Sequence, residues 1–596
     1  MRSKFPPVIH ALPAALLLTS CAVAQPQPTN TLSPDLAASI QARPSELAVA
    51  IDQFQADWGA LGRTYRVDTS PRRRERLMAL CDSWLSQVST LDTSGFSVAG
   101  KVDAFLFLNH LRHERRLLER DQARYAAIEP RVPFAHIIDD LEEARRHGDA
   151  LDYEKAAGAL DDLRQQVDKS KTDFEAGCKE QSDGPSRVIS PTTAKQVLRV
   201  VESLQSDLAE WHDFYDTYDP QFSWWTRRPF DGAMESLRGM TTIVREKGVG
   251  ITTDNPNVIV GTPIGRDELV EELRFAMVPY SPEELLAIAD REAVWCHAEL
   301  KKASQDMALG DDWKAALERV KSAHGAPGEQ PALIRHLAQE AVAFVRDKDL
   351  ITVPPLAEET WRMDMMSQDR QLVTPFFTGG EVISVAFPTE GMDHQQKVMS
   401  LRSNNRPFAR ATVFHELMPG HHLQQYMESR WRTYRAPFST PFWTEGWALY
   451  WEMLLWDQGF PRTPEERIGM LFWRTHRCAR IVFSLRFHLG EWSPQQCVDY
   501  LVAEVGHEKA SAEGEVRRAV SGDYEPLYQA AYMLGGLQLR ALHQELVGSG
   551  HWTNREFHDA VMRESNIPIE AVRAILTRQG MGLDYQSSWR FDDANK

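Results

Sequence analysis

Apolar residues recur at helical spacing through most of this 596-residue chain. A spacing near 3.6 residues, with charged residues in between, is typical of amphipathic helices that bury one face in a core. The sequence SPEE at residues 281–284 marks a helix start, because proline fits the first turn and acidic residues favour it. The sequence therefore predicts a mainly α fold with one large helical body. Its clearest helical segments are residues 102–124, 153–171, 192–215, 282–309 and 311–324.

A different pattern occupies residues 373–388, VTPFFTGGEVISVAFP. Aromatic and β-branched residues lie on both sides of a Gly-Gly pair, which predicts a small two-stranded β hairpin. The hairpin precedes a histidine-rich helical segment, residues 411–430. A strand beside that helix could pair with an extended peptide. A purely structural hairpin explains the pattern equally well.

Charge and composition limit the class of partner. The net charge is −17 and 43 % of the residues are hydrophobic, which is enough for a large core. The triplet Arg72-Arg73-Arg74 is followed by Glu75 within a helical segment, so it is interpreted as a solvated helix face. We therefore expect no nucleic-acid partner.

The N-terminus has the pattern of a bacterial export signal. Arg2 and Lys4 precede a short apolar run that could not span a bilayer. Residues 18–21, LTSC, resemble a lipobox, which would place a lipid on Cys21. Residues 22–24, AVA, offer an ordinary cleavage site instead. We expect a protein on the periplasmic face of a bacterial membrane, attached only through a lipid anchor at Cys21, or alternatively soluble in the periplasm.

The rest of the chain is expected to form one domain. Residues 1–21 are the signal peptide with its lipobox, and residues 22–40, rich in Pro, Gln and Thr, are predicted to be a flexible tether. Residues 41–596 are predicted to be a single helical catalytic domain, which could form two lobes around a cleft, with the metal site in 370–590. The other cysteines are dispersed without a CxxC pair, so we expect buried free thiols.

The strongest chemical signal is HELMPGHHLQQ, residues 415–425. In the zinc-peptidase motif H-E-x-x-H, histidines at i and i+4 share one helix face. Here Pro419-Gly420 comes first, followed by His421 and His422, and on a straight helix neither histidine would close a zinc site with His415. Proline breaks the hydrogen-bond ladder and glycine tolerates unusual dihedral angles. The pair could therefore loop out and return His421 to the i+4 position, with His422 as the alternative ligand.

Carboxylates complete the pattern. Glu416 has the place of the general base in H-E-x-x-H. Residues 444–452, TEGWALYWE, follow, and Glu445 begins a helix of the kind that supplies the third ligand in His-His-Glu peptidases. Glu452, seven residues on, returns to the same face and could orient a ligand histidine.

The two motifs, HExxPGHHxQ and EGWALYxE, resemble the signature of the bacterial family catalogued as domain of unknown function 885 (DUF885), best over about residues 370–590. The resemblance implies a helical zinc-peptidase-like fold. It also implies one zinc ion per chain, held by His415, His421 and Glu445, with Glu416 as the base.

Two later segments also look like this family, each with departures. Residues 477–492 keep Arg480 and His488, but SLR replaces the usual Asp-Thr-Gly before the histidine. Residues 515–540 resemble E-x-x-R…P…Y-x-x-G, with PLYQ in place of PGQA. We expect Tyr532 or His488 to stabilise the oxyanion and Arg517 to bind a substrate carboxylate. Arg480 and His422 are expected to be further substrate-binding residues.

The sequence therefore predicts an exported zinc-dependent metallopeptidase that cleaves short peptides through a zinc-activated water, with Glu416 as general base. A zinc amidase or esterase on a non-peptide substrate is the alternative, and a catalytically inactive binding lipoprotein is the third. The expected partner is a peptide or small amide. The pattern leaves open whether cleavage is internal or terminal, and which oligomeric state the protein adopts.

Overall fold

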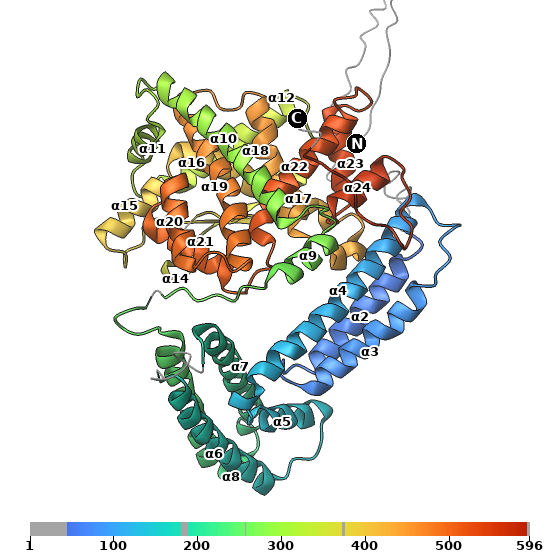
Figure 1. Ribbon diagram of the computed structural model, residues 1–596, viewed down its shortest axis with the longest axis vertical. Coiled ribbons are helices and arrows are strands. Elements are labelled where there is room, and N and C mark those ends of the chain that lie inside the picture. The colour runs from blue at the N-terminus through green and yellow to red at the C-terminus, as the bar shows by residue number, and fades with distance from the viewer. Residues whose placement is uncertain (1–44, 180–188, 257, 372–375, 593–596) are drawn as a thin grey trace, which may run out of the picture. The chain divides into compact units, whose positions relative to one another are not determined.

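The computed structural model describes residues 45–179, 189–256, 258–371 and 376–592. The expected signal peptide and tether, and residues 373–375 of the expected hairpin, lie outside this part of the chain. Residues 44–596 group into one unit by their contacts, and nearly all of its elements are helices (Figure 1). The mainly α fold is therefore confirmed.

The N-terminal part is a run of long helices whose starts follow from their caps. The Ser70 and Ser97 side chains each accept a hydrogen bond from a backbone N–H of the first turn, and so begin the second and third helices. The elements are α2 (Ala48–Thr64), α3 (Pro71–Val88), α4 (Val98–Ile128), the 3₁₀ turn η1 (Glu129–Arg131) and α5 (Ala135–His147). They continue with α6 (Tyr153–Gly177), α7 (Pro191–Asp216), α8 (Pro220–Ile243) and the π-helical turn η2 (Val244–Val249).

Helices α5 to α8 enclose a hydrophobic core of their own, which includes Phe174, Trp211 and Phe222. The other buried hydrophobic residues form separate clusters. The largest of these clusters includes residues of α2 and α4 as well as residues of the later helices. Arg435 links these helices to the later part of the chain. Its guanidinium is fully buried and pairs with Asp103 of α4 at 2.8 Å and with Glu564 at 2.7 Å.

The middle of the chain adds α9 (Arg266–Phe275), α10 (Pro282–Asp306), α11 (Trp313–Ser322), α12 (Gln330–Asp347) and α13 (Pro355–Thr360). The start of α10 is as the sequence predicted: Ser281 and Glu284 form a capping box, and Pro282 opens the helix. None of the described helices is both long enough and apolar enough to cross a membrane. The described cysteines are all buried free thiols, in agreement with the prediction.

The small sheet differs from the predicted hairpin. Strand β2 (Val382–Val385) pairs in parallel with β1 (Arg362–Met365), and a short helix, α14 (Gln368–Gln371), lies between them in sequence. In the described part of the segment before the Gly-Gly pair, one antiparallel bridge joins Thr378 to Ser384. The hairpin prediction was wrong because β2 pairs with a segment about 20 residues earlier in the chain, and the local Gly-Gly signal could not reveal this partner. The sheet does lie beside the metal helix, since Ile383 packs in one cluster with Val413.

The C-terminal half contains the elements that carry the site: α15 (His394–Ser403), α16 (Arg406–Glu416), α17 (His421–Glu428), η3 (Thr433–Phe438), α18 (Pro441–Asp457), α19 (Pro464–His488), α20 (Pro494–Tyr500), η4 (Leu501–Val505), α21 (Lys509–Val520), α22 (Tyr528–Leu546), α23 (Asn554–Arg563) and α24 (Ile569–Leu576). Helix α18 is buried on all sides and includes Trp443, Trp447 and Trp451. The backbones of α18 and α22 are in direct contact: a Cβ atom added to Gly446 would lie only 2.6 Å from the Cα of Gly535. This close approach brings the start of α18 to the tyrosines of α22.

Candidate metal centre

The Pro-Gly pair separates two helices. Helix α16 ends at Glu416 and α17 begins at His421, with a turn between them. A side chain at Gly420 would collide with the backbone carbonyl of His415, so this crossing requires glycine. The sequence predicted a loop within one helix, and the structure has a full break between two helices. The break still brings His421 next to His415, as predicted. The ring centroids of His415 and His421 lie 4.9 Å apart.

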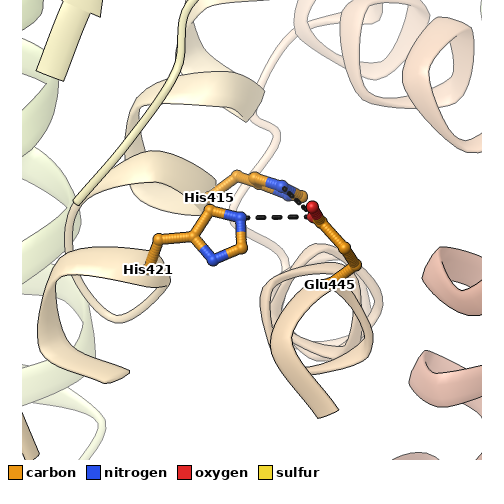
Figure 2. A group of neighbouring side chains, drawn as sticks. All are labelled: His415, His421 and Glu445. Carbon is orange, nitrogen blue, oxygen red and sulfur yellow. Dashed lines mark ion pairs between the residues drawn. The ribbon is translucent and has the colours of Figure 1, made fainter. Parts of the chain in front are cut away.

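Glu445, from the first turns of α18, completes a buried group of three donors. Its Oε2 atom lies 3.3 Å from Nε2 of His421 and 3.8 Å from Nε2 of His415. The three potential ligand atoms all lie within 4.8 Å of one another, and each residue is buried. Figure 2 shows both imidazole rings turned towards the carboxylate.

These donors fit a zinc ion. Tetrahedral zinc with ligands at about 2.0–2.1 Å separates its ligand atoms by about 3.3 Å, close to the observed spacing. The Nδ1 atom of His415 pairs with Glu452 Oε1 at 2.7 Å, and that of His421 with Gln424 Oε1 at 3.2 Å. Both Nε2 atoms are thereby oriented towards the shared centre. Oε2 of Glu445 is buried and accepts no hydrogen bond from the described residues, which leaves it available to a cation.

The electrostatics of the site favour the ionised form of its carboxylate. Burial favours the neutral form of Glu445, but the two imidazoles beside it hold its pKa well below the usual value. Burial alone would lower the pKa of His421, yet the Glu445 carboxylate raises it to about 9. Glu445 is thus ionised, the form in which a carboxylate binds a metal ion.

Two further contacts hold Glu445 and Glu416 in place, the first through a side chain and the second through the backbone. The Tyr528 hydroxyl, at the start of α22, donates a hydrogen bond to Oε1 of Glu445. The Gly-Gly segment before β2 lies against Glu416, where the Gly380 N–H donates to the Glu416 carbonyl at 3.3 Å. A side chain on Gly379 would collide with Glu416 itself. Glu416 is therefore fixed between the sheet and the first ligand.

The Glu452→Gln variant is expected to bind zinc about tenfold or more weakly, although every ligand remains. Glutamine keeps the shape but removes the negative charge that orients the His415 ring through its Nδ1 atom. The measurement is a zinc competition titration against a chromophoric chelator. Glu491→Gln, which alters an exposed pair with Arg486, is the control and should leave the zinc affinity unchanged. An unchanged affinity in Glu452→Gln would contradict the orienting role.

A cavity of about 300 Å³ opens beside the three donors. The donors, Glu416 and the Gly379 turn form part of its wall. The rest of the wall combines aromatic rings with charged groups: Phe376, Phe377, Trp473, Tyr524, Tyr528, Tyr532, Arg477, Arg480, Arg518 and Glu515. The site therefore combines aromatic surface with many charged and polar groups.

Only some of the predicted substrate residues line this cavity. Tyr532 does, with its ring nearly parallel to that of His415 and the centroids 6.3 Å apart. Arg480 does as well. His422 does not: its Nε2 pairs with the Ala357 carbonyl at 2.7 Å.

His488 and Arg517 are also outside the described wall, and Arg518 takes the place expected for Arg517. The positions of the two residues on their helices explain this. His488 is the last residue of α19, about two turns beyond Arg480, and adjacent residues of α21 face different sides.

The prediction missed several contributors, among them Tyr528, Arg477, Arg518 and Gln424. Arg477 could have been found, because it lies three residues before Arg480 and so shares its helix face. Tyr528 could not, because no local pattern shows that α22 packs on α18.

Known structures support the fold. A protein from Shewanella oneidensis, named a “putative lipoprotein of unknown function”, matches with a TM-score of 0.66 at 14 % identity over 88 % of this chain and 98 % of that one. A protein from Colwellia psychrerythraea, named a “putative lipoprotein”, matches with a TM-score of 0.56 at 14 % identity, over 89 % of this chain and 97 % of that one. At such identity the likeness shows the fold alone.

A comparison with curated proteins of known function finds no match. One family model, described as “Bacterial protein of unknown function (DUF885)”, matches residues 54–576. That range includes the broken metal helix, the Glu445 helix and the whole cavity wall. The chain therefore belongs to the DUF885 family.

Proposed function

We propose that this protein is an exported zinc-dependent metallopeptidase that cleaves short peptides. One observation carries the proposal: three buried donors that fit a metal ion and the adjacent carboxylate of Glu416 line the same cavity. A structural metal site would be closed, whereas hydrolytic sites keep three protein ligands and an open face.

The donor set favours zinc, because imidazole nitrogens with one carboxylate suit it better than they suit calcium or magnesium. When bound, zinc supplies Lewis acidity that polarises a carbonyl oxygen and lowers the pKa of water. His415, His421 and Glu445 would hold the ion. Gln424, Glu452 and Tyr528 would keep these three side chains in position.

The remaining chemistry falls to residues of the cavity wall. Glu416 takes the proton of the attacking water and delivers it to the leaving amine. The Tyr532 hydroxyl donates to the carbonyl oxygen as it gains negative charge. Phe376, Phe377 and Trp473 offer apolar surface to a substrate side chain.

The N-terminal pattern supports an anchor at Cys21 on the periplasmic face. The matched proteins from Shewanella and Colwellia both have the words “putative lipoprotein” in their names. A lipid anchor would place the enzyme where peptides from the cell envelope accumulate.

Metal removal tests the function. Treatment with a chelator is expected to abolish cleavage of a mixed short-peptide library by the purified protein, and one equivalent of zinc is expected to restore it. Mass spectrometry of the library before and after incubation provides the measurement. Cleavage of amide or ester probes in place of peptides would favour the amidase or esterase alternative. A zinc-loaded protein that cleaves none of these would refute the hydrolase.

A further inference from the structure

Three arginines and three glutamates line the cavity, so a bound divalent metal ion would give its wall an excess of positive charge. Arg477 and Arg480 lie one turn apart on α19, and Arg518 of α21 faces them across the same space. The carboxylates of the wall are Glu416, Glu445 and Glu515. Since Glu445 is required for the metal, its charge is not available to the arginines.

Only one of the three guanidiniums is fully matched by a carboxylate. Arg480 binds Glu515 through Nε at 2.8 Å and through Nη2 at 2.6 Å. Arg477 has only a loose contact to Glu452, at 3.6 Å, and that carboxylate already serves His415. A buried guanidinium that lacks an anionic partner is costly.

Arg518 makes no ion pair with any residue in the described part of the chain. Its guanidinium instead lies over the ring of Tyr524, at 4.5 Å from the centroid, and 5.6 Å from that of Tyr528. These aromatic faces hold the planar group without using its forked donors. The donors remain free to bind an anion of matching geometry.

We propose that Arg477, Arg480 and Arg518 form a subsite for the C-terminal carboxylate of the substrate, so that the protein acts as a carboxypeptidase. The inference rests on the proposed hydrolase function and defines its substrate class. Guanidinium and carboxylate match in a planar, bidentate arrangement. A free C-terminus is the carboxylate that every peptide carries, whatever its sequence.

The position of Tyr532 places this subsite close to the reacting bond. Its ring centroid lies 4.3 Å from the Arg480 guanidinium carbon and 4.6 Å from that of Arg477. The His415 ring centroid lies 6.3 Å from the same point, so the guanidinium of Arg480 and the first ligand are at most about 11 Å apart. An extended peptide spans about 3.3–3.6 Å per residue. Cleavage is therefore expected within three residues of the C-terminus.

Binding without turnover gives the test. Zinc-loaded Glu416→Gln protein is dialysed against an N-acetylated tripeptide mixture with free C-termini, and separately against the same mixture with C-terminal amides. Mass spectrometry of the retained peptides is expected to show about 10- to 100-fold tighter binding of the free acids. This is the difference expected when the amides lose the charged hydrogen bonds that a carboxylate forms with arginine. Peptide amides with an Asp or Glu side chain that are retained as strongly as the free acids would show that the subsite binds an acidic side chain. That result would overturn the C-terminal assignment.

Three variants in the Glu416→Gln background locate the effect. Arg518→Gln is expected to weaken retention of the free acids about tenfold, and Arg518→Lys less, because lysine keeps the charge but loses the fork. Arg486→Gln, on α19 but paired with Glu491 at the surface, is the control and should bind like its parent. Equal losses in Arg518→Gln and Arg486→Gln would overturn the subsite.

The wild-type enzyme separates this inference from the hydrolase proposal. Faster cleavage of the free-acid mixture, with products shortened at the C-terminus, would support both. Equal cleavage of acids and amides would overturn the carboxylate subsite and leave the hydrolase standing. Preferential binding of free acids without cleavage of any peptide would support the subsite and count against the hydrolase. No retention of either mixture would overturn the subsite.

Discussion

The wild-type protein is expected to bind one zinc ion, which the His421→Ala variant is expected to lose and the His422→Ala variant to retain. The two side chains are adjacent in sequence but turn in different directions. His421 faces Glu445 at 3.3 Å, and His422 pairs with a backbone carbonyl of α13. Loss of one of three protein ligands should lower zinc affinity about 100-fold or more, because each ligand contributes a large part of the free energy of zinc binding.

Elemental analysis of the mature wild-type protein and the two variants, all purified without chelator, provides the measurement. The wild type should contain about one zinc ion per chain. Circular dichroism checks that both variants remain folded, since both histidines are buried. Zinc that persists in His421→Ala and disappears from His422→Ala would move the second ligand by one residue. A wild type that holds no metal even after zinc is added back would favour the binding-lipoprotein alternative.

The ligands could be predicted from the sequence because they belong to short motifs within single helices. A proline-glycine pair between two histidines has few structural outcomes, and both a loop within the helix and a break between helices bring His421 to His415. The EGWALYWE segment likewise fixes two carboxylates seven residues apart on one face of α18. Glu452 at 2.7 Å from His415 confirms the orienting contact that this spacing predicted.

The wall of the cavity was harder to predict, because it depends on how distant helices face one another. Arg517 and Arg518 cannot be distinguished until the packing of α21 fixes which residue points inward. His488 was assigned by motif spacing, but it lies at the end of α19, away from the wall. The parallel pairing of β2 with β1 is equally non-local, and sequence periodicity reports only on neighbours along the chain.

A Glu416→Gln variant is expected to keep its zinc and to lose about 10²- to 10⁴-fold in kcat/KM towards the best peptide of the library. Glutamine fills the same space between His415 and the Gly379 turn, so the ligands should not move. It cannot accept the proton of the attacking water or pass one to the leaving amine, which is the contribution ascribed to general acid–base catalysis. Zinc analysis and initial rates measured on the same preparation separate a lost base from a lost metal.

The control for Glu416→Gln is Glu428→Gln, a partly buried carboxyl of α17 that lies outside the cavity wall. Burial raises the pKa of Glu428 to about 7, so it is already partly neutral near physiological pH, and glutamine mimics that form. Its activity should therefore stay near that of the wild type. If both variants lost activity alike, the effect would reflect disturbance of the buried site as a whole. If Glu416→Gln remained fully active, another group would have to act as the base, because a carboxamide cannot carry the proton from the attacking water to the leaving amine.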